Sequence, residues 1–107
     1  MIVSLDSVLS THPDEGVTRR VIAHGGNIMA VHVTFKKGAV GSIHRHIHEQ
    51  ISYIVSGSFE YYENGEKHLL KAGDSYFVPS NVDHGVVALE DSVILDFFTP
   101  QRLDFLT

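Results

Sequence analysis

The chain has 107 residues, no cysteine and a net charge of −5, with 43% apolar and 20% charged residues. This size and composition fit one globular domain over residues 1–107, and the acidic charge argues against a nucleic-acid partner, because phosphate binding needs a basic surface. The lack of cysteine excludes disulfides and thiolate metal sites, so any metal ion must be held by nitrogen and oxygen atoms.

The N-terminal residues predict neither a secretory signal nor a membrane anchor. Residues 1–6 lack the basic stretch and the long apolar run of a signal peptide. No apolar run approaches the roughly 18 residues that a membrane span needs. The segment around residues 4–10 is expected to form at most one short turn of helix. We therefore expect a cytoplasmic protein that has no membrane partner.

Short strand patterns follow one another from residue 28 onward. From Met29 to Phe35 every second residue is large and apolar, which is typical of a half-buried strand. The Asn64-Gly65 pair predicts a tight type I′ hairpin turn. Strands at this spacing indicate an antiparallel sandwich or barrel, so the predicted fold class is all-β. The strands are expected over residues 28–35, 50–55, 58–62, 68–71, 75–78, 84–89 and 93–98.

Three of the eight histidines lie within five residues of one another. His44 and His46 are two residues apart on an expected strand, so their imidazoles point to the same face and can reach one ion. Gln50 has the same parity and adds an amide oxygen if the strand continues regularly. His84 begins a later strand and can complete the set from across a barrel. The alternative is a barrel with an empty polar pocket, because a His-x-His pair alone is a weak signal.

Two blocks of sequence resemble the two motifs of the cupin superfamily. The first block is Gly38-x5-His44-x-His46-x3-Gln50-x6-Gly57, and the second is Gly73-x5-Pro79-x4-His84. The order and spacing of both blocks are more informative than either block alone. The resemblance implies a single-domain cupin, which is a double-stranded β-helix or jelly-roll barrel.

This chain departs from the general cupin pattern at three positions. It has Asn81 and Ala88 where the family usually has glycine and asparagine, which concerns turn and strand detail. It also has Gln50 where the family usually has glutamate. A neutral amide leaves the ion its full charge, so the site should be more Lewis-acidic and should bind metal less tightly. Three nitrogens and one oxygen suit one divalent ion of zinc, nickel, cobalt or manganese, and the missing carboxylate disfavours dioxygen chemistry.

The last expected strand carries a carboxylate. Ile94, Asp96 and Phe98 share one face, and we favour the interior for that face. Burial would raise the pKa of Asp96 and suit it to proton transfer near neutral pH. The alternative is an outward Asp96, because the residues of opposite parity are equally apolar. Arg102 carries the planar fork that binds a carboxylate ligand through two hydrogen bonds, unless it is an ordinary surface residue.

Residues 44–50 and 96–102 together resemble the small pectin-degradation cupins of the KdgF type, and the similarity covers nearly the whole chain. The resemblance implies a metal-dependent isomerase without a redox cofactor. Such an enzyme converts the 4,5-unsaturated uronate monosaccharides left by pectin or alginate lyases into linear 4-deoxy-5-keto uronates by ring opening and tautomerisation. The implied metal ligands are His44, His46, Gln50 and His84, and the implied active-site residues are Asp96, Phe98 and Arg102.

Two other functions stay open. One is another metal-dependent cupin enzyme, such as a sugar isomerase or an oxygenase. The other is a non-catalytic cupin that binds a sugar acid. The expected partner is a small uronate molecule in the leading hypothesis. A homodimer is also expected, because a domain of this size buries a modest share of its surface.

Overall fold

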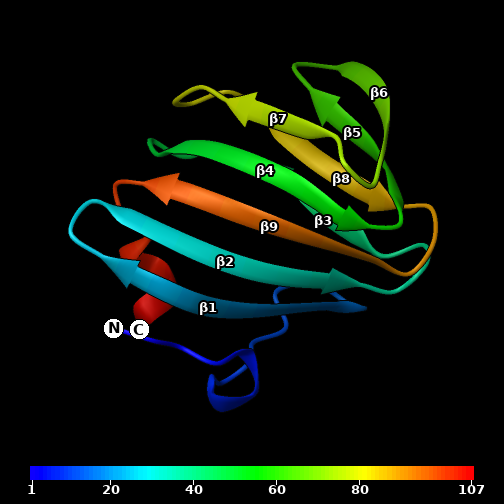
Figure 1. Cartoon of the computed structure of the whole chain (residues 1–107). Coiled ribbons are helices and arrows are strands. Elements are labelled where there is room, and N and C mark those ends of the chain that lie inside the picture. Colours follow the sequence, from blue (N-terminus) through cyan, green and yellow to red (C-terminus); the bar gives the residue numbers. More distant parts are fainter.

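The computed structural model describes residues 1–107 as two β-sheets that face each other (Figure 1). The first sheet has the strand order β1-β2-β9-β4-β7, the second has the order β3-β8-β5-β6, and all neighbouring strands are antiparallel. The predicted all-β class is therefore confirmed. The strands are β1 (Val17–Gly25), β2 (Ile28–Phe35), β3 (Val40–His44), β4 (Glu49–Ser56), β5 (Ser58–Glu63), β6 (Glu66–Lys71), β7 (Ser75–Val78), β8 (His84–Ala88) and β9 (Ser92–Thr99).

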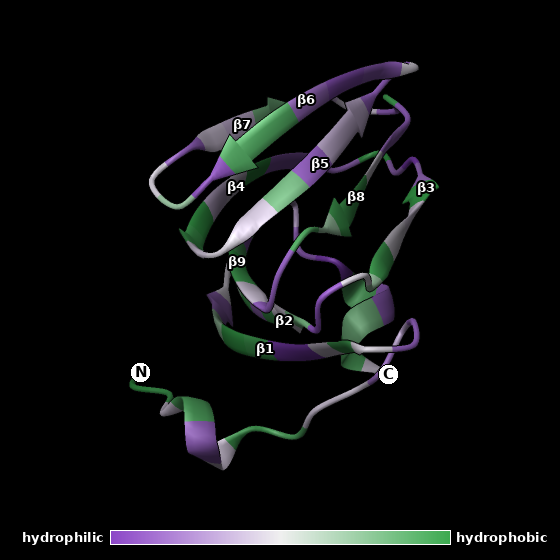
Figure 2. Ribbon diagram, turned by 90° about the vertical axis from the view of Figure 1, so that its right-hand side faces the viewer, coloured by the Kyte–Doolittle hydropathy of each residue, from purple (hydrophilic) through white to green (hydrophobic).

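The hydrophobic core lies between the two sheets. Successive side chains of a strand point to opposite faces, so every second side chain faces inward. Most strands carry hydrophobic residues, green in Figure 2, among them. The predicted inward set of β2, from Met29 to Phe35, is buried. Phe35 and Phe59 meet edge to face, with ring centroids 5.1 Å apart, and join the two sheets.

The hairpin between β5 and β6 turns as predicted. Asn64 and Gly65 both have positive φ angles, 48° and 83°, and Glu63 pairs with Glu66 across the turn. Asparagine and glycine tolerate this left-handed backbone better than other residues do. The predicted type I′ geometry is consistent with these angles.

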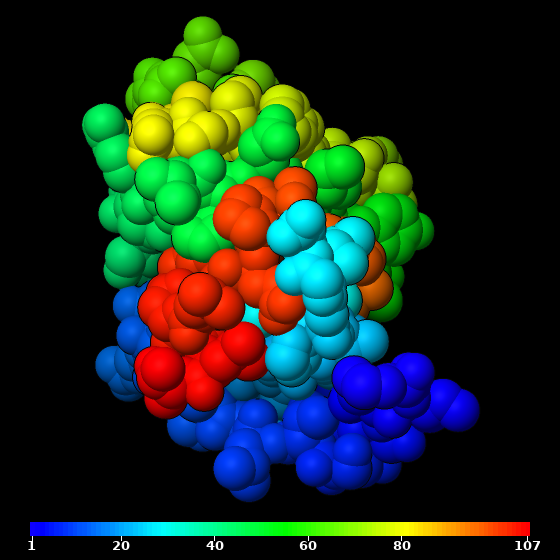
Figure 3. All heavy atoms as spheres, turned by 90° about the vertical axis from the view of Figure 1, so that its left-hand side faces the viewer, coloured from blue at the N-terminus to red at the C-terminus, as the bar shows by residue number.

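Two short 3-10 helices complete the fold, η1 (Leu5–Ser7) and η2 (Leu103–Leu106). η1 lies where one turn of helix was expected. Neither helix is long and apolar enough to cross a membrane. The C-terminal residues, red in Figure 3, lie at the surface between the green residues that follow β3 and the blue N-terminal residues.

The sequence prediction was wrong or incomplete at two places. It missed β1, because Arg19 occupies an inward position between Val17 and Val21 and interrupts the apolar alternation. It also expected His44, His46 and Gln50 to follow one regular strand. β3 ends at His44 and β4 begins at Glu49, so the chain turns between the two strands.

Candidate metal centre

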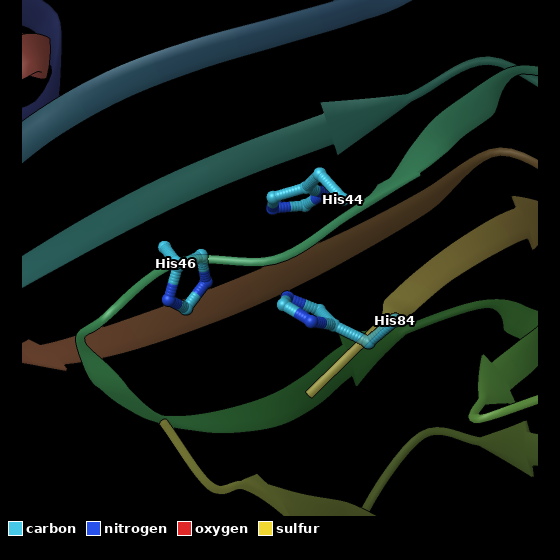
Figure 4. A group of neighbouring side chains, drawn as sticks. All are labelled: His44, His46 and His84. Carbon is cyan, nitrogen blue, oxygen red and sulfur yellow. The ribbon is translucent and has the colours of Figure 1, made fainter. Parts of the chain in front are cut away.

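Three histidines lie close together at the ends of the paired strands β3 and β8 and in the loop after β3 (Figure 4). His44 ends β3, His46 lies in the loop that follows it, and His84 begins β8. His44 is the register partner of His84, which places their rings 4.4 Å apart. One ring nitrogen from each histidine lies within 4.8 Å of the other two. The three side chains therefore converge. His46 reaches the cluster because the loop turns there, and not because it follows His44 by two residues on one strand.

Backbone carbonyls fix the orientation of all three imidazoles. Nδ1 of His44 donates to the carbonyl of Ser42 at 2.8 Å, and Nδ1 of His84 donates to that of Val82 at 2.9 Å. Nδ1 of His46 donates to the carbonyl of His48 at 2.9 Å. A neutral imidazole that donates through Nδ1 has its lone pair on Nε2. Each ring therefore presents a free Nε2 lone pair, the arrangement that metal-binding histidines use.

Gln50 brings an oxygen atom to the same place. Its Oε1 lies 3.0 Å from Nε2 of His46 and 3.2 Å from Nε2 of His84. Its Nε2 donates to Oγ of Ser52 at 2.8 Å and is 3.4 Å from a carboxylate oxygen of Asp96. The amide nitrogen of Gln50 is thus hydrogen-bonded away from the histidines, and its amide oxygen faces them.

The charge states of the histidines favour a cation between these atoms. Burial lowers the pKa of His84 to about 4, and burial together with the nearby Arg102 charge lowers the pKa of His46. Both rings are neutral at pH 7, so their Nε2 atoms carry no proton to share with Oε1 of Gln50. The Nε2 atoms of these rings and the carbonyl oxygen of Gln50 form a set of donor atoms that a positive ion could bind. This donor set fits a divalent metal that accepts nitrogen and oxygen ligands.

A cavity of about 350 Å³ opens beside the cluster, between the two sheets. His44, Gln50 and His84 line one part of it. The cavity is also lined by the three residues that the sequence placed in the active site: Asp96, Phe98 and Arg102. The structure thus brings all the sequence-predicted site residues to one region.

Asp96 points inward from β9, in the interior position favoured from the sequence. It pairs with Val31 on β2 and with Ser52 on β4. Burial raises the pKa of its carboxyl to about 6, and a hydrogen bond from Ser52 and the charge of Arg102 oppose that rise. Oγ of Ser52 donates to Oδ1 of Asp96 at 2.5 Å. Asp96 is therefore a carboxyl group that can exchange a proton near neutral pH.

Ser52 is a site residue that sequence reasoning missed. It is fully buried and forms hydrogen bonds with both Gln50 and Asp96. A polar residue at the inward parity of β4, two positions after Gln50, was the available signal. Ser52 therefore connects the candidate ligand Gln50 to the half-buried acid Asp96.

Arg102 and Phe98 form an aromatic and cationic wall of the cavity. The Phe98 ring lies 5.6 Å from the His46 ring, and Phe105 of η2 lies 5.7 Å from Phe98. The guanidinium carbon of Arg102 is 4.2 Å from the centre of the Phe105 ring and 5.2 Å from that of Phe98. Nε and Nη2 of Arg102 donate to the two carboxylate oxygens of Asp104 at 3.1 and 3.0 Å. One edge of the Arg102 fork is thus already paired.

A two-sheet antiparallel barrel with a histidine cluster against its interior cavity defines a cupin. A family model for the cupin domain matches residues 31–98, so the chain belongs to the cupin family.

Its relatives include KdgF proteins, as the sequence motifs predicted. The pectin degradation protein KdgF of Dickeya dadantii (strain 3937) is 49% identical over 94 residues, which cover 86% of each protein. The structure of KdgF from Halomonas sp. superimposes with a TM-score of 0.91 at 40% identity, over 98% of this chain and 97% of that one. An RmlC-like cupin from Shewanella frigidimarina NCIMB 400 superimposes with a TM-score of 0.88 at 37% identity, over 98% and 99% of the two chains.

Proposed function

We propose that this protein is a metal-dependent isomerase that converts cyclic 4,5-unsaturated uronates into linear 4-deoxy-5-keto uronates. One observation carries the proposal: three of the four proposed metal ligands, a half-buried acid and a cationic aromatic wall line a single cavity. The 49% identity to a pectin degradation protein over most of the chain supports the choice of substrate class.

The reaction rearranges atoms without adding or removing any. The hydroxyl at C1 loses its proton and the bond between C1 and the ring oxygen breaks, which yields an aldehyde. The ring oxygen becomes the enolate oxygen at C5, and a proton added at C4 then gives the 5-ketone. The product is an isomer of the substrate, so the reaction needs no oxidant, reductant or nucleotide.

The residues have separate roles in this proposal. His44, His46, Gln50 and His84 would hold a divalent ion. Such an ion supplies positive charge that stabilises negative charge developing on the sugar oxygens.

Three further side chains act on the substrate. Asp96 takes the hydroxyl proton and returns a proton to carbon, which suits a carboxyl group with a pKa near 6. Phe98 packs against the sugar ring, and Arg102 adds positive charge near the substrate carboxylate.

The decisive experiment follows the ultraviolet band of the conjugated double bond in 4,5-unsaturated galacturonate. We expect the protein to speed the decay of this band above the uncatalysed rate, and a chelator to abolish the acceleration. Decay at the uncatalysed rate by protein shown to contain metal would overturn the proposal. Oxygen uptake during the reaction would instead identify an oxygenase.

The role of Asp96 has its own test. Asp96→Asn should bind the same amount of metal, because Asp96 is not among the proposed ligands. Its turnover should fall by about two orders of magnitude or more, as is common on losing a general acid–base group. Metal analysis and the ultraviolet assay measure both quantities, and a near-normal rate would remove Asp96 from the mechanism.

A further inference from the structure

Arg19 is a charged residue at an inward position of a strand. It lies on β1 and pairs with the buried Val33 on β2, so its side chain faces the cavity, which it lines together with Arg102. Its strand neighbours on the same face, Val17 and Val21, pack in or against the core. A strand position with this environment ordinarily takes an apolar side chain.

The guanidinium group of Arg19 lacks a protein acceptor. It contributes to no ion pair and donates no side-chain hydrogen bond, whereas Arg102 is paired with Asp104 through both Nε and Nη2. Its one close contact is aromatic, since its guanidinium carbon lies 3.7 Å from the centre of the Phe105 ring. The five N–H donors of this half-buried cation at the cavity therefore have no acceptor in the chain.

Two cations share one aromatic ring at this wall. Arg102 is 4.2 Å and Arg19 is 3.7 Å from the centre of the Phe105 ring. Burial and the nearby Arg102 charge lower the pKa of Arg19, while Asp104 opposes this. Asp104 pairs with Arg102, and the carboxylates of Asp14 and Asp96 line the same cavity. None of these three acids forms an ion pair or a hydrogen bond with the Arg19 guanidinium, which leaves that cation for an anionic ligand.

An inward charge on an edge strand can instead protect that strand from pairing with another chain. β1 is an edge strand of its sheet. At Arg19, however, the edge is already covered: the backbone groups of Thr11 and Arg19 exchange two hydrogen bonds of 2.9 and 2.8 Å. Protection of the edge therefore does not account for the charge at this position.

We propose that Arg19 binds the carboxylate of the substrate, and that this residue makes the cavity specific for sugar acids over neutral sugars. The inference rests on the proposed function for its choice of substrate. The planar fork of Arg19 matches a carboxylate through two parallel hydrogen bonds. Arg102, with one edge paired to Asp104, adds charge beside it. The Phe98 ring contacts both Phe105, on which Arg19 stacks, and the His46 ring, so Arg19 and the proposed metal ligands lie around the same cavity.

The test compares Arg19→Gln and Arg19→Lys with Arg20→Gln in the metal-loaded protein. Arg20 is a matched control, because it neighbours Arg19 on β1 but pairs with His32 and faces the other side of the sheet. KM for 4,5-unsaturated galacturonate should rise roughly tenfold to a hundredfold in Arg19→Gln, as expected for loss of a charged hydrogen-bonding partner. Arg19→Lys should fall between Arg19→Gln and the unchanged protein, and Arg20→Gln should leave KM unchanged.

The methyl ester of the same sugar separates recognition from structural damage. The ester lacks the anionic carboxylate, so Arg19→Gln and the unchanged protein should process it with similar KM. An equal loss on acid and ester would show that Arg19 only supports the fold, and an unchanged KM on the acid would also overturn the inference. Metal content and thermal midpoint are measured for every variant.

A failure of the proposed function remains distinguishable from a failure of this inference. If the unchanged protein does not convert the unsaturated sugar, the inference about Arg19 is tested by calorimetry. The experiment measures the binding of galacturonate and of its methyl ester. Binding of the acid that weakens in Arg19→Gln and not in Arg20→Gln supports the carboxylate site without the reaction. Equal binding of acid and ester, or binding insensitive to Arg19, overturns it.

Discussion

At the scale of single residues, Gln50 has two tasks that a glutamate could not combine. Its oxygen faces the histidines while its nitrogen donates to Ser52 and lies 3.4 Å from Asp96. The sequence predicted the oxygen ligand, because Gln50 stands at the right motif position. It could not predict the donor side, because the contact with Asp96 depends on the register between β4 and β9.

Gln50→Glu should bind the metal more tightly and catalyse more slowly. A carboxylate attracts a divalent ion more strongly than an amide does, and we expect a gain in affinity of about tenfold or more. The same charge would stand beside Asp96 and reduce the positive charge of the site. Chelator competition measures the affinity and the ultraviolet assay measures the rate.

Glu49→Gln is the control for that substitution, because Glu49 is the exposed neighbour on β4. It should change neither quantity. Weaker metal binding in Gln50→Glu would contradict the assignment of Gln50 as a ligand.

At the scale of elements, alternation and turn chemistry predicted most strands, while the site depends on two exceptions to regular alternation. β1 was not predicted because the charged Arg19 occupies one of its inward positions. Arg19 is also the residue that we propose binds the substrate carboxylate. The loop after β3 escaped prediction because nothing local shows that the strand stops at His44. Both exceptions arise from contacts between segments far apart in the chain.

The turn between β4 and β5 depends on Gly57, which the first cupin block contains. Its φ angle is 82°, and a Cβ atom there would collide with Ser92 and with the backbone of Asp91. Gly57→Ala should lower the free energy of unfolding by about 1–3 kcal/mol or more, from backbone strain and the collision together.

Gly65→Ala provides the comparison for Gly57→Ala. Gly65 has a similar φ angle of 83°, but a Cβ atom there would meet nothing within 4 Å. Denaturant unfolding of both variants should show a smaller decrease in the free energy of unfolding for Gly65→Ala than for Gly57→Ala. Equal losses would mean that the contact with Ser92 contributes nothing.

At the scale of the whole molecule, the candidate metal ligands come from both sheets. His44 and His84 belong to the four-stranded sheet, and Gln50 belongs to the five-stranded sheet. An ion bound to all three would hold the sheets together on the side of the cavity. The sequence named these candidate ligands but expected His84 to reach the ion from across the barrel. His84 is instead the strand neighbour of His44 in the same sheet, and Gln50 is the residue that comes from the opposite sheet. A single sequence does not show the order of strands in a sheet.

Removing the metal should therefore lower the thermal midpoint of unfolding. A ligand that binds the folded chain alone stabilises it by an amount that grows with its concentration over its dissociation constant, about 2.7 kcal/mol at a hundredfold excess. Differential scanning calorimetry with and without chelator measures the shift. In His44→Ala/His84→Ala the chelator should have no effect, and an equal shift in that variant would place the ion elsewhere.

The homodimer expected from the small size of the domain stays a prediction. The chain mass is 11.9 kDa, and sedimentation equilibrium should give twice that value. A mass equal to one chain at micromolar concentration would contradict it.

The backbone carbonyls that hold the three imidazoles have a practical consequence. The protein backbone itself orients the rings, so we expect that one ion could replace another while the protein stays folded. Cobalt(II), which accepts similar ligands to zinc and absorbs visible light, can then serve as a coloured reporter. Its spectrum would change when a sugar approaches the ion, and substrate binding could be watched directly.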